Sequence, residues 1–403
     1  MNVGIIRSVY RSIRKVTGLT EKQMLTPYYW IPYHLYGSGK AWRPLFVTLE
    51  LTYLCNLRCQ MCSLVVGEMV TKAGQKTNPD LMNGDGNLRR EVNTAEYLHL
   101  VEEMTAGGVK AVQITGGEPL LRKDTLVIAE AIKKKGMHLS LIHNGWARPD
   151  VYGELVRIGL DSITVSVDGT RAVHDKVRGV KGSFDHTHEA IEHLLREKKI
   201  QGKSSPKITV SCAISALNQH DITNLVDLFE DSEVDDMNLG YLHFSTAKRN
   251  EKTEAKMNGQ DQILHLKNPE LPDPVLHVDT QALAQRIARI KAEKGKRKLP
   301  ITFSPDLSAE EIKLQYTDEW FTFSNKCFYA WYATRIDPWG QMYPCWIDIR
   351  LGDVREHTFM ELWNGQGYRG FRRLIRKEKL VPKCTTCCVL NDRYWSKLPT
   401  FRR

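Results

Sequence analysis

Between residues 45 and 243, short apolar and β-branched runs alternate with longer segments whose apolar residues recur at helical spacing. The alternation predicts strand–helix units, which join by right-handed crossovers into a parallel sheet and place the chain in the α/β class. Six such units are too few to close an eight-stranded barrel. The expected strands are Leu45–Leu51, Val109–Thr115, His138–His143, Ser162–Val167, Lys207–Ile214 and Asp236–His243, with helices near 94–106, 124–135, 149–158, 185–199, 220–230 and 279–294.

The 403 residues are enough for two or three domains. We expect an N-terminal basic amphipathic extension over 1–44, a barrel over 45–305 and a C-terminal domain over 306–403, which is richer in Trp, Tyr and Cys. Two stretches, 63–92 and 244–278, break the strand–helix rhythm. Loops of this length are uncommon without a role, so we interpret them as inserts in the barrel.

The N-terminal extension carries Val3, Ile6, Tyr10 and Ile13 at helical spacing among basic residues, and an aromatic stretch follows over 27–33. Such a segment either lies on a membrane surface or caps the main domain, and we favour the cap. No apolar run approaches the roughly 18 residues of a membrane span, and no secretory segment is evident. The sequence therefore predicts a cytoplasmic protein, with peripheral membrane contact through 1–44 as the alternative.

The formal net charge of +10 favours anionic partners, but the surplus of basic residues is spread along the chain. Solvated helix faces explain such a distribution better than a nucleic-acid groove does. We therefore do not expect nucleic acid as a partner.

Directly after the first predicted strand, Cys55, Cys59 and Cys62 form a C-x3-C-x2-C motif. Three thiolates can hold three irons of a [4Fe–4S] cluster and leave the fourth iron open to a substrate or cofactor. Zinc is the alternative, but structural zinc needs four ligands and no fourth Cys or His lies near this loop. Nine cysteines in a chain without secretory features also indicate metal or redox chemistry rather than disulfides.

Two further motifs lie where expected strands end, and ligands of parallel α/β proteins bind at that rim. Gly116-Gly117-Glu118-Pro119 follows the second strand; glycines let the backbone approach a ligand closely, although a plain turn is the alternative. Ser166 and Asp168, two residues apart, share one face of the fourth strand. A turn accounts for the segment 143–145, and the three histidines between 186 and 193 lack metal-binding spacing.

The cysteine loop and the Gly-Gly-Glu-Pro turn together resemble those of the radical S-adenosylmethionine (radical SAM) enzymes. That resemblance implies an open, partial (β/α)6 TIM-like barrel, and a [4Fe–4S] cluster whose open iron chelates S-adenosylmethionine (SAM). Reductive cleavage of SAM then gives a 5′-deoxyadenosyl radical. Asn218 and Leu242 are weaker correspondences. The cofactor-binding residues that it implies are Gly116, Gly117, Glu118, Ser166, Asp168, Arg178 and Asn218.

A second cysteine set comprises Cys327, Cys345, Cys384 and Cys387, which suffice to close a site for zinc or for a [4Fe–4S] cluster. The fragments Asp337-Pro-Trp-Gly, Leu351-Gly-Asp-Val and Glu361-Leu-Trp-Asn resemble the SPASM and Twitch auxiliary-cluster domains. The resemblance implies a small α+β domain with one auxiliary [4Fe–4S] cluster, because a full SPASM domain typically has seven cysteines. Cys388 is an alternative ligand or a hydrogen-atom donor, and Cys212 is interpreted as an inert buried thiol.

From the cysteine count, this arrangement is nearest to the aminocyclitol dehydrogenase of butirosin biosynthesis. We therefore expect a radical SAM enzyme that dehydrogenates or remodels a small polyol, sugar or aminocyclitol, with an electron donor such as flavodoxin or ferredoxin. The alternative is an epimerase or carbon–carbon bond-forming enzyme acting on a lipid or a peptide. A zinc protein that associates with RNA is a further alternative, but it leaves Gly-Gly-Glu-Pro unexplained.

Overall fold

The computed structural model describes residues 21–64, 69–70, 76–77, 89–257, 276–347, 349–387 and 390. Its centre is an open nine-stranded sheet in the order β11-β10-β1-β4-β5-β6-β7-β8-β9. Every neighbouring pair is parallel except β10 with β11. The strands are β1 (Phe46–Glu50), β4 (Ala111–Thr115), β5 (His138–His143), β6 (Ser162–Ser166), β7 (Lys207–Ile214), β8 (Asp236–Tyr241), β9 (Ile301–Ser304), β10 (Ala333–Ile336) and β11 (Met342–Tyr343).

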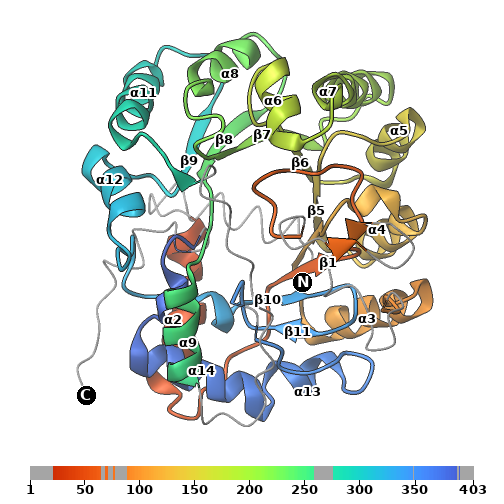
Figure 1. Ribbon diagram of the computed structural model, residues 1–403. Coiled ribbons are helices and arrows are strands. Elements are labelled where there is room, and N and C mark those ends of the chain that lie inside the picture. The colour runs from red at the N-terminus through yellow and green to blue at the C-terminus, as the bar shows by residue number, and fades with distance from the viewer. Residues whose placement is uncertain are drawn as a thin grey trace.

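Helices surround the sheet on one face, as Figure 1 shows, and the predicted α/β partial barrel is confirmed. All six predicted strands are present. The helices of this layer are α3 (Thr94–Gly107), α4 (Thr125–Lys134), α5 (Pro149–Ile158), α6 (Arg171–Arg178), α7 (Ser183–Ile200), α8 (Ile222–Phe229), α11 (Thr280–Glu293) and α12 (Ala309–Thr317).

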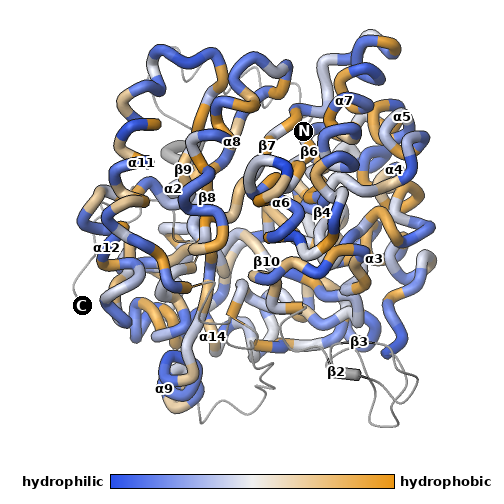
Figure 2. The backbone as a smooth tube through the Cα atoms, turned by 45° about the horizontal axis from the view of Figure 1, so that its top comes forward, coloured by the Kyte–Doolittle hydropathy of each residue, from blue (hydrophilic) through white to orange (hydrophobic). Residues whose placement is uncertain are grey.

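Residues along each barrel strand alternate between two environments. Val112 and Ile114 of β4, like Val210 and Cys212 of β7, are at most 1% exposed because they pack beneath the helices. Hydrophobic residues accordingly concentrate in the strands and in the helix sides that face them (Figure 2). The opposite, concave face of the sheet carries partly exposed residues such as Thr115.

The C-terminal region extends this sheet instead of forming a separate layer. Strand β10 pairs in parallel with β1, with Thr48 opposite Arg335, and β11 returns antiparallel as the predicted hairpin. A small two-stranded sheet, β2 (Met69–Val70) with β3 (Lys76–Thr77), lies within the expected insert 63–92. We retain the division at residue 305 as a proposal, with β10 as the element that joins the two parts. The remaining elements are α2 (Glu21–Leu35), α9 (Ala247–Met257), α13 (Phe359–Trp363), α14 (Gln366–Glu378), and the 3-10 helices η2 (Pro119–Leu121), η3 (Tyr329–Trp331) and η4 (Pro382–Cys384).

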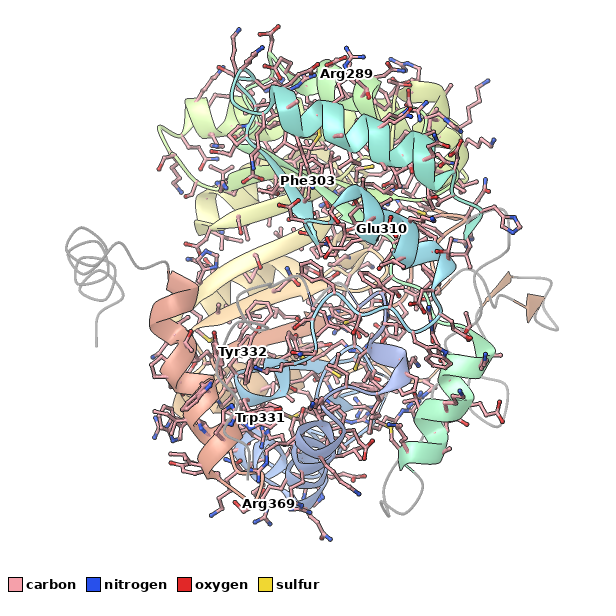
Figure 3. All side chains as sticks on the ribbon, turned by 90° about the vertical axis from the view of Figure 1, so that its left-hand side faces the viewer. Arg289, Phe303, Glu310, Trp331, Tyr332 and Arg369 are labelled. Atoms are coloured by element: carbon pink, nitrogen blue, oxygen red, sulfur yellow. The ribbon has the colours of Figure 1, made fainter. Side chains whose placement is uncertain are left out.

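The described part of the N-terminal extension packs against the C-terminal region. The ring of Tyr33 on α2 lies 4.8 Å from that of Trp331, and Ala41 N donates to Asn364 Oδ1 at 3.0 Å. Figure 3 shows α2 alongside this region at the level of Trp331 and Tyr332. These contacts are those of a cap, whereas the predicted apolar stripe, 3–13, and the basic residues around it lie outside the described residues. Within the described ranges, no helix combines the length and apolarity needed to cross a bilayer.

Candidate functional site

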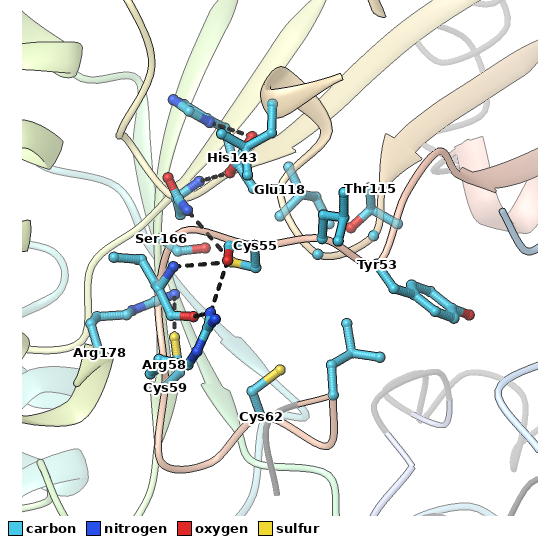
Figure 4. A pocket seen from close by; sticks show the side chains of 18 of the residues that line it. Tyr53, Cys55, Arg58, Cys59, Cys62, Thr115, Glu118, His143, Ser166 and Arg178 are labelled. Carbon is cyan, nitrogen blue, oxygen red and sulfur yellow. Dashed lines mark hydrogen bonds and ion pairs between the residues drawn. The ribbon is translucent and has the colours of Figure 1, made fainter. Parts of the chain in front are cut away.

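The three cysteines of the C-x3-C-x2-C motif occupy one loop beyond the carboxyl end of β1, on the rim of a cavity of about 370 Å³ (Figure 4). This volume lies within the usual range for small-molecule and cofactor sites. The sequence-predicted residues that line the cavity are Cys55, Cys59, Cys62, Gly116, Gly117, Glu118, Ser166 and Arg178. The structure thus brings together most of the site from three separate strand ends and the end of one helix.

The Gly-Gly-Glu-Pro turn lies directly on the backbone that leads into the cysteine loop. Gly117 N donates to Thr52 O at 2.7 Å, and Glu118 N donates to Leu54 O at 2.8 Å. A Cβ at position 117 would approach Leu54 O to 2.4 Å, and Gly116 has a φ of +134°. Both positions therefore require glycine, because any side chain would push the turn away from the cysteine loop.

Glu118 is fully buried, and its carboxylate accepts two backbone hydrogen bonds and lies beside His143. Oε1 accepts from Leu120 N at 2.8 Å and lies 2.9 Å from His143 Nδ1, while Oε2 accepts from Asn144 N at 2.9 Å. The carboxylate therefore links the turn to the end of β5. Because both oxygens are engaged, the main-chain atoms of the turn are the freer acceptors for a cofactor ammonium group.

Asn144 carries this link on to the first cysteine, a role that the sequence interpretation of 143–145 as a plain turn missed. Its Nδ2 donates to Asn56 Oδ1 at 2.8 Å and lies 3.9 Å from Cys55 Sγ. Hydrogen bonds to cluster sulfur ligands are one of the means by which proteins adjust a cluster. The position of this Asn at a strand end beside the expected site was the available signal.

Helix α6, which the sequence did not predict, anchors the cysteine loop from the other side. Arg58 N donates to Arg178 O at 3.0 Å and Gln60 N to Val177 O at 2.9 Å, so the carbonyl groups of the last turn of α6 find donors in the loop. Gly179 follows with a φ of +70°, and a Cβ there would reach Arg58 O at 2.2 Å. The loop and α6 therefore fit only with glycine at this position.

Arg178 and Asp168 form a buried ion pair, with Nη2 and Oδ2 2.7 Å apart, and Arg178 Nη1 lies 3.7 Å from Cys59 Sγ. Burial disfavours the cation, but Asp168 and Cys59 hold the pKa of Arg178 above its usual value. Arg178 Nε has no hydrogen-bond partner among the described residues, although it is buried beside the cavity. A buried donor without a partner fits an anionic ligand such as the carboxylate of SAM.

The structure does not bring Asn218 into the cavity. This side chain is 2% exposed, and its Nδ2 donates to Asp168 O at 2.9 Å and to Ala213 O at 3.0 Å. It lies behind Asp168, which itself reaches the cavity only through Arg178. Cys212, predicted to be an inert thiol, is 1% exposed and accepts from the same amide at 3.4 Å.

The three thiols fit a metal cluster by their chemistry. Burial raises the pKa of Cys55 and of Cys59, so neither becomes a thiolate readily without a cation. Apolar side chains pack around the inner side of the loop, among them Leu57, Met61, Val177, Leu242 and Phe244, while Arg58 and Gln60 of the loop are exposed. An apolar lining on the cavity side suits chemistry that water would quench.

The second cysteine set also comes together. Cys327 precedes η3, Cys345 follows β11, and Cys384 and Cys387 flank a turn in which Thr386 has a φ of +59°. Burial and the neighbouring thiols raise the pKa of Cys327, Cys345 and Cys384. Cys388 lies outside the described residues.

The described residues contain no group of three or more His, Cys, Asp or Glu side chains arranged around one metal ion. By donor chemistry alone, the three thiols of the loop suit an open-site [4Fe–4S] cluster, and the four thiols of the second set suit either a zinc ion or a closed [4Fe–4S] cluster.

Comparison with known proteins agrees with this geometry. Residues 49–229 match the radical SAM superfamily model, and residues 327–388 match the iron–sulfur cluster-binding SPASM domain. The AdoMet-dependent heme synthase of Methanosarcina barkeri is 25% identical over 85% of this chain and 88% of its own length. The PqqA peptide cyclase of Xanthomonas euvesicatoria is 24% identical over 82% of this chain and 77% of its own length.

Among solved structures, Streptococcus suis SuiB bound to its precursor peptide SuiA superimposes with a TM-score of 0.58. The match is 13% identical and covers 84% of this chain and 69% of SuiB. At that identity the similarity establishes the fold alone.

Proposed function

The chain belongs to the radical SAM superfamily and carries a SPASM iron–sulfur domain, and from that premise we propose that it modifies a peptide by hydrogen-atom abstraction. As a member of that superfamily it is an enzyme that uses [4Fe–4S] clusters and SAM. When bound, the open-site cluster and SAM supply a 5′-deoxyadenosyl radical. The remaining question is what each part of this chain contributes and which substrate it accepts.

We assign the open-site cluster to Cys55, Cys59 and Cys62, because these thiols share one loop at the cavity. The turn of Gly116 and Gly117 would orient the methionine end of SAM through its main-chain atoms. Arg178 supplies the buried cation for the SAM carboxylate, and the apolar lining on the cavity side keeps water from the radical.

We assign the auxiliary cluster to Cys327, Cys345, Cys384 and Cys387, which lie before η3, after β11, at the end of η4 and just beyond η4. An electron donor of the flavodoxin or ferredoxin class would supply the electron that starts the reaction. The auxiliary cluster is suited to accept an electron from an oxidised substrate.

One observation narrows the class of substrate: the concave face of the sheet carries many hydroxyl and amide side chains. Closed parallel barrels fill this space with Val, Ile and Leu. Here the hydroxyl and amide residues that share this face by register include Gln113, Ser140, Thr164, Ser166, Thr209, Ser211, Asn238, Thr302 and Ser304, and they lie beside a few apolar residues such as Ile142 and Ala213.

Such a lining favours a substrate rich in hydrogen-bonding groups and disfavours a lipid. A peptide main chain and a polyol both satisfy it. The relatives support a peptide, because they include a peptide cyclase and one structural neighbour was solved with a precursor peptide. They support the peptide alternative better than the polyol that the cysteine count suggested.

A porphyrin is the second candidate substrate, because the heme synthase match spans most of both chains. The two candidates make different demands on the concave face. A porphyrin presents a broad apolar plane with carboxylates at its edge, whereas a peptide presents amides along its length.

The test is hydrogen transfer from substrate to SAM. Cluster-loaded enzyme is reduced with SAM in the presence of a uniformly deuterated peptide library, iron-coproporphyrin III or a mixture of polyols. We expect deuterium in 5′-deoxyadenosine, and accelerated formation of that product, with the peptides alone. Stimulation by the porphyrin or by the polyols, with none by peptides, would refute the peptide assignment.

A further inference from the structure

A buried network connects the entrance of the cysteine loop to the auxiliary region. Tyr53, which lines the SAM cavity, donates through its hydroxyl to Glu50 Oε2 at 2.7 Å. Arg335 Nη1 donates to the same oxygen, also at 2.7 Å. Glu50 ends β1 and Arg335 lies on β10, so the contact bridges the strands that join the two parts of the chain.

Arg335 extends from this bridge toward the auxiliary cysteines. Its guanidinium lies 4.1 Å from the ring centre of Tyr343, two residues before Cys345, and 5.2 Å from that of Trp346, the residue after Cys345. The side chain is only 5% exposed. Its charge is therefore weakly screened by water and acts strongly on nearby groups.

We propose that Arg335 is the residue that sets the reduction potential of the auxiliary cluster, with Glu50 as its counter-charge from the barrel. A fixed buried cation stabilises the reduced, more negative form of a cluster and so raises its potential. Glu50 offsets part of that charge. Because Glu50 also holds Tyr53 at the SAM cavity, the pair couples the electrostatics of the two cluster sites.

The two charges of this ion pair face different sites, which distinguishes it from an ordinary buried ion pair. The cation stacks on the residues around Cys345, whereas the carboxylate sits at the end of β1 and bonds to Tyr53. The inference concerns electron affinity and is independent of the substrate proposed above.

The test measures the auxiliary cluster alone. A background in which Cys55, Cys59 and Cys62 are replaced by Ala retains only the auxiliary ligands, and its potential is measured by redox titration followed by electron paramagnetic resonance. R335M keeps the length of the side chain without its charge, and R335K keeps the charge without the planar fork. E50Q keeps a hydrogen-bond acceptor for Tyr53 and Arg335. K133M, which breaks a partly buried ion pair with Asp161 at the amino end of β6, is the matched control.

We expect R335M to disfavour reduction about tenfold, which is about 59 mV for a one-electron couple, and R335K to stay near the parent value. E50Q should move the potential in the opposite direction, and K133M should leave it unchanged. Iron content reports whether each variant carries its cluster. If R335M does not take up its iron–sulfur cluster, the potentials of R335K and E50Q still test the proposal. Equal potentials in all variants, or shifts of the same sign in R335M and E50Q, would overturn the proposal. A purely structural role would not shift the potentials of these two variants in opposite directions.

Discussion

Replacement of Glu118 by Gln tests whether this carboxylate acts by holding the site together. Its two oxygens accept from Leu120 N and Asn144 N, and Oε1 also lies 2.9 Å from His143 Nδ1. An amide offers one oxygen and one NH2 group. Whichever way the Gln side chain turns, its NH2 group faces a backbone N–H donor that loses its acceptor.

The expected cost follows from these contacts. A hydrogen bond to a charged acceptor contributes about 1.5–3 kcal/mol, and an unsatisfied buried donor costs about 1–3 kcal/mol. The site is fully buried, with the Glu118 side chain 1% exposed, so water cannot compensate. We therefore expect E118Q to lower the free energy of unfolding by about 4 kcal/mol and to displace Asn144, which contacts Cys55.

Urea unfolding of the metal-free, reduced protein measures the stability loss, and equilibrium dialysis of the cluster-loaded protein measures SAM binding. E103Q is the matched control, because Glu103 accepts from Phe359 N away from the cavity. We expect stability and SAM binding to fall together in E118Q. If E118Q were as stable as the control but lost SAM binding at least tenfold, the carboxylate would contact SAM directly and our reasoning would be refuted.

Three further predictions follow from buried groups. R178M leaves the Asp168 carboxylate buried without its cation and should cost about 3–5 kcal/mol in urea unfolding, whereas a loss below 1 kcal/mol would show that the pair is not buried as described. C345A should reduce the iron of the reconstituted protein from about eight to about four atoms per chain, and full retention would exclude Cys345 as an auxiliary ligand. Burial raises the pKa of Asp337 to about 6, so its folded form binds a proton that the unfolded chain has lost at the same pH. Stability should therefore fall as the pH rises from about 4 to 6, by up to about 3 kcal/mol, and D337N should remove that part of the dependence.

The sequence predicted the barrel well because its signals are local. The expected strands His138–His143 and Lys207–Ile214 match β5 and β7, since alternating apolar residues must pack beneath helices. Helix α6 was missed because its eight residues are mostly polar and its stability comes from contacts with the cysteine loop. The parallel addition of β10 to β1 joins segments almost 300 residues apart, and no local pattern carries such a pairing.

The site residues also divide into those that local sequence patterns predict and those that depend on contacts between distant segments. Motif spacing identified the cysteines and the glycine turn because their chemistry demands those residues at those positions. The support for Glu118 from His143 and Asn144 was missed, because it depends on how neighbouring strand ends meet. Asn218 was expected at the cofactor but its amide is used within the protein, which only the packing around Asp168 reveals.

The most direct test of the account is the formation of 5′-deoxyadenosine. Wild-type protein and C59A, both purified and reconstituted without oxygen, are reduced in the presence of SAM, and the product is measured by chromatography. We expect 5′-deoxyadenosine from the wild type and none from C59A, because two thiols cannot hold the open-site cluster. A cluster-free wild-type protein, or equal product from both proteins, would contradict the assignment of this cavity as the site of SAM cleavage.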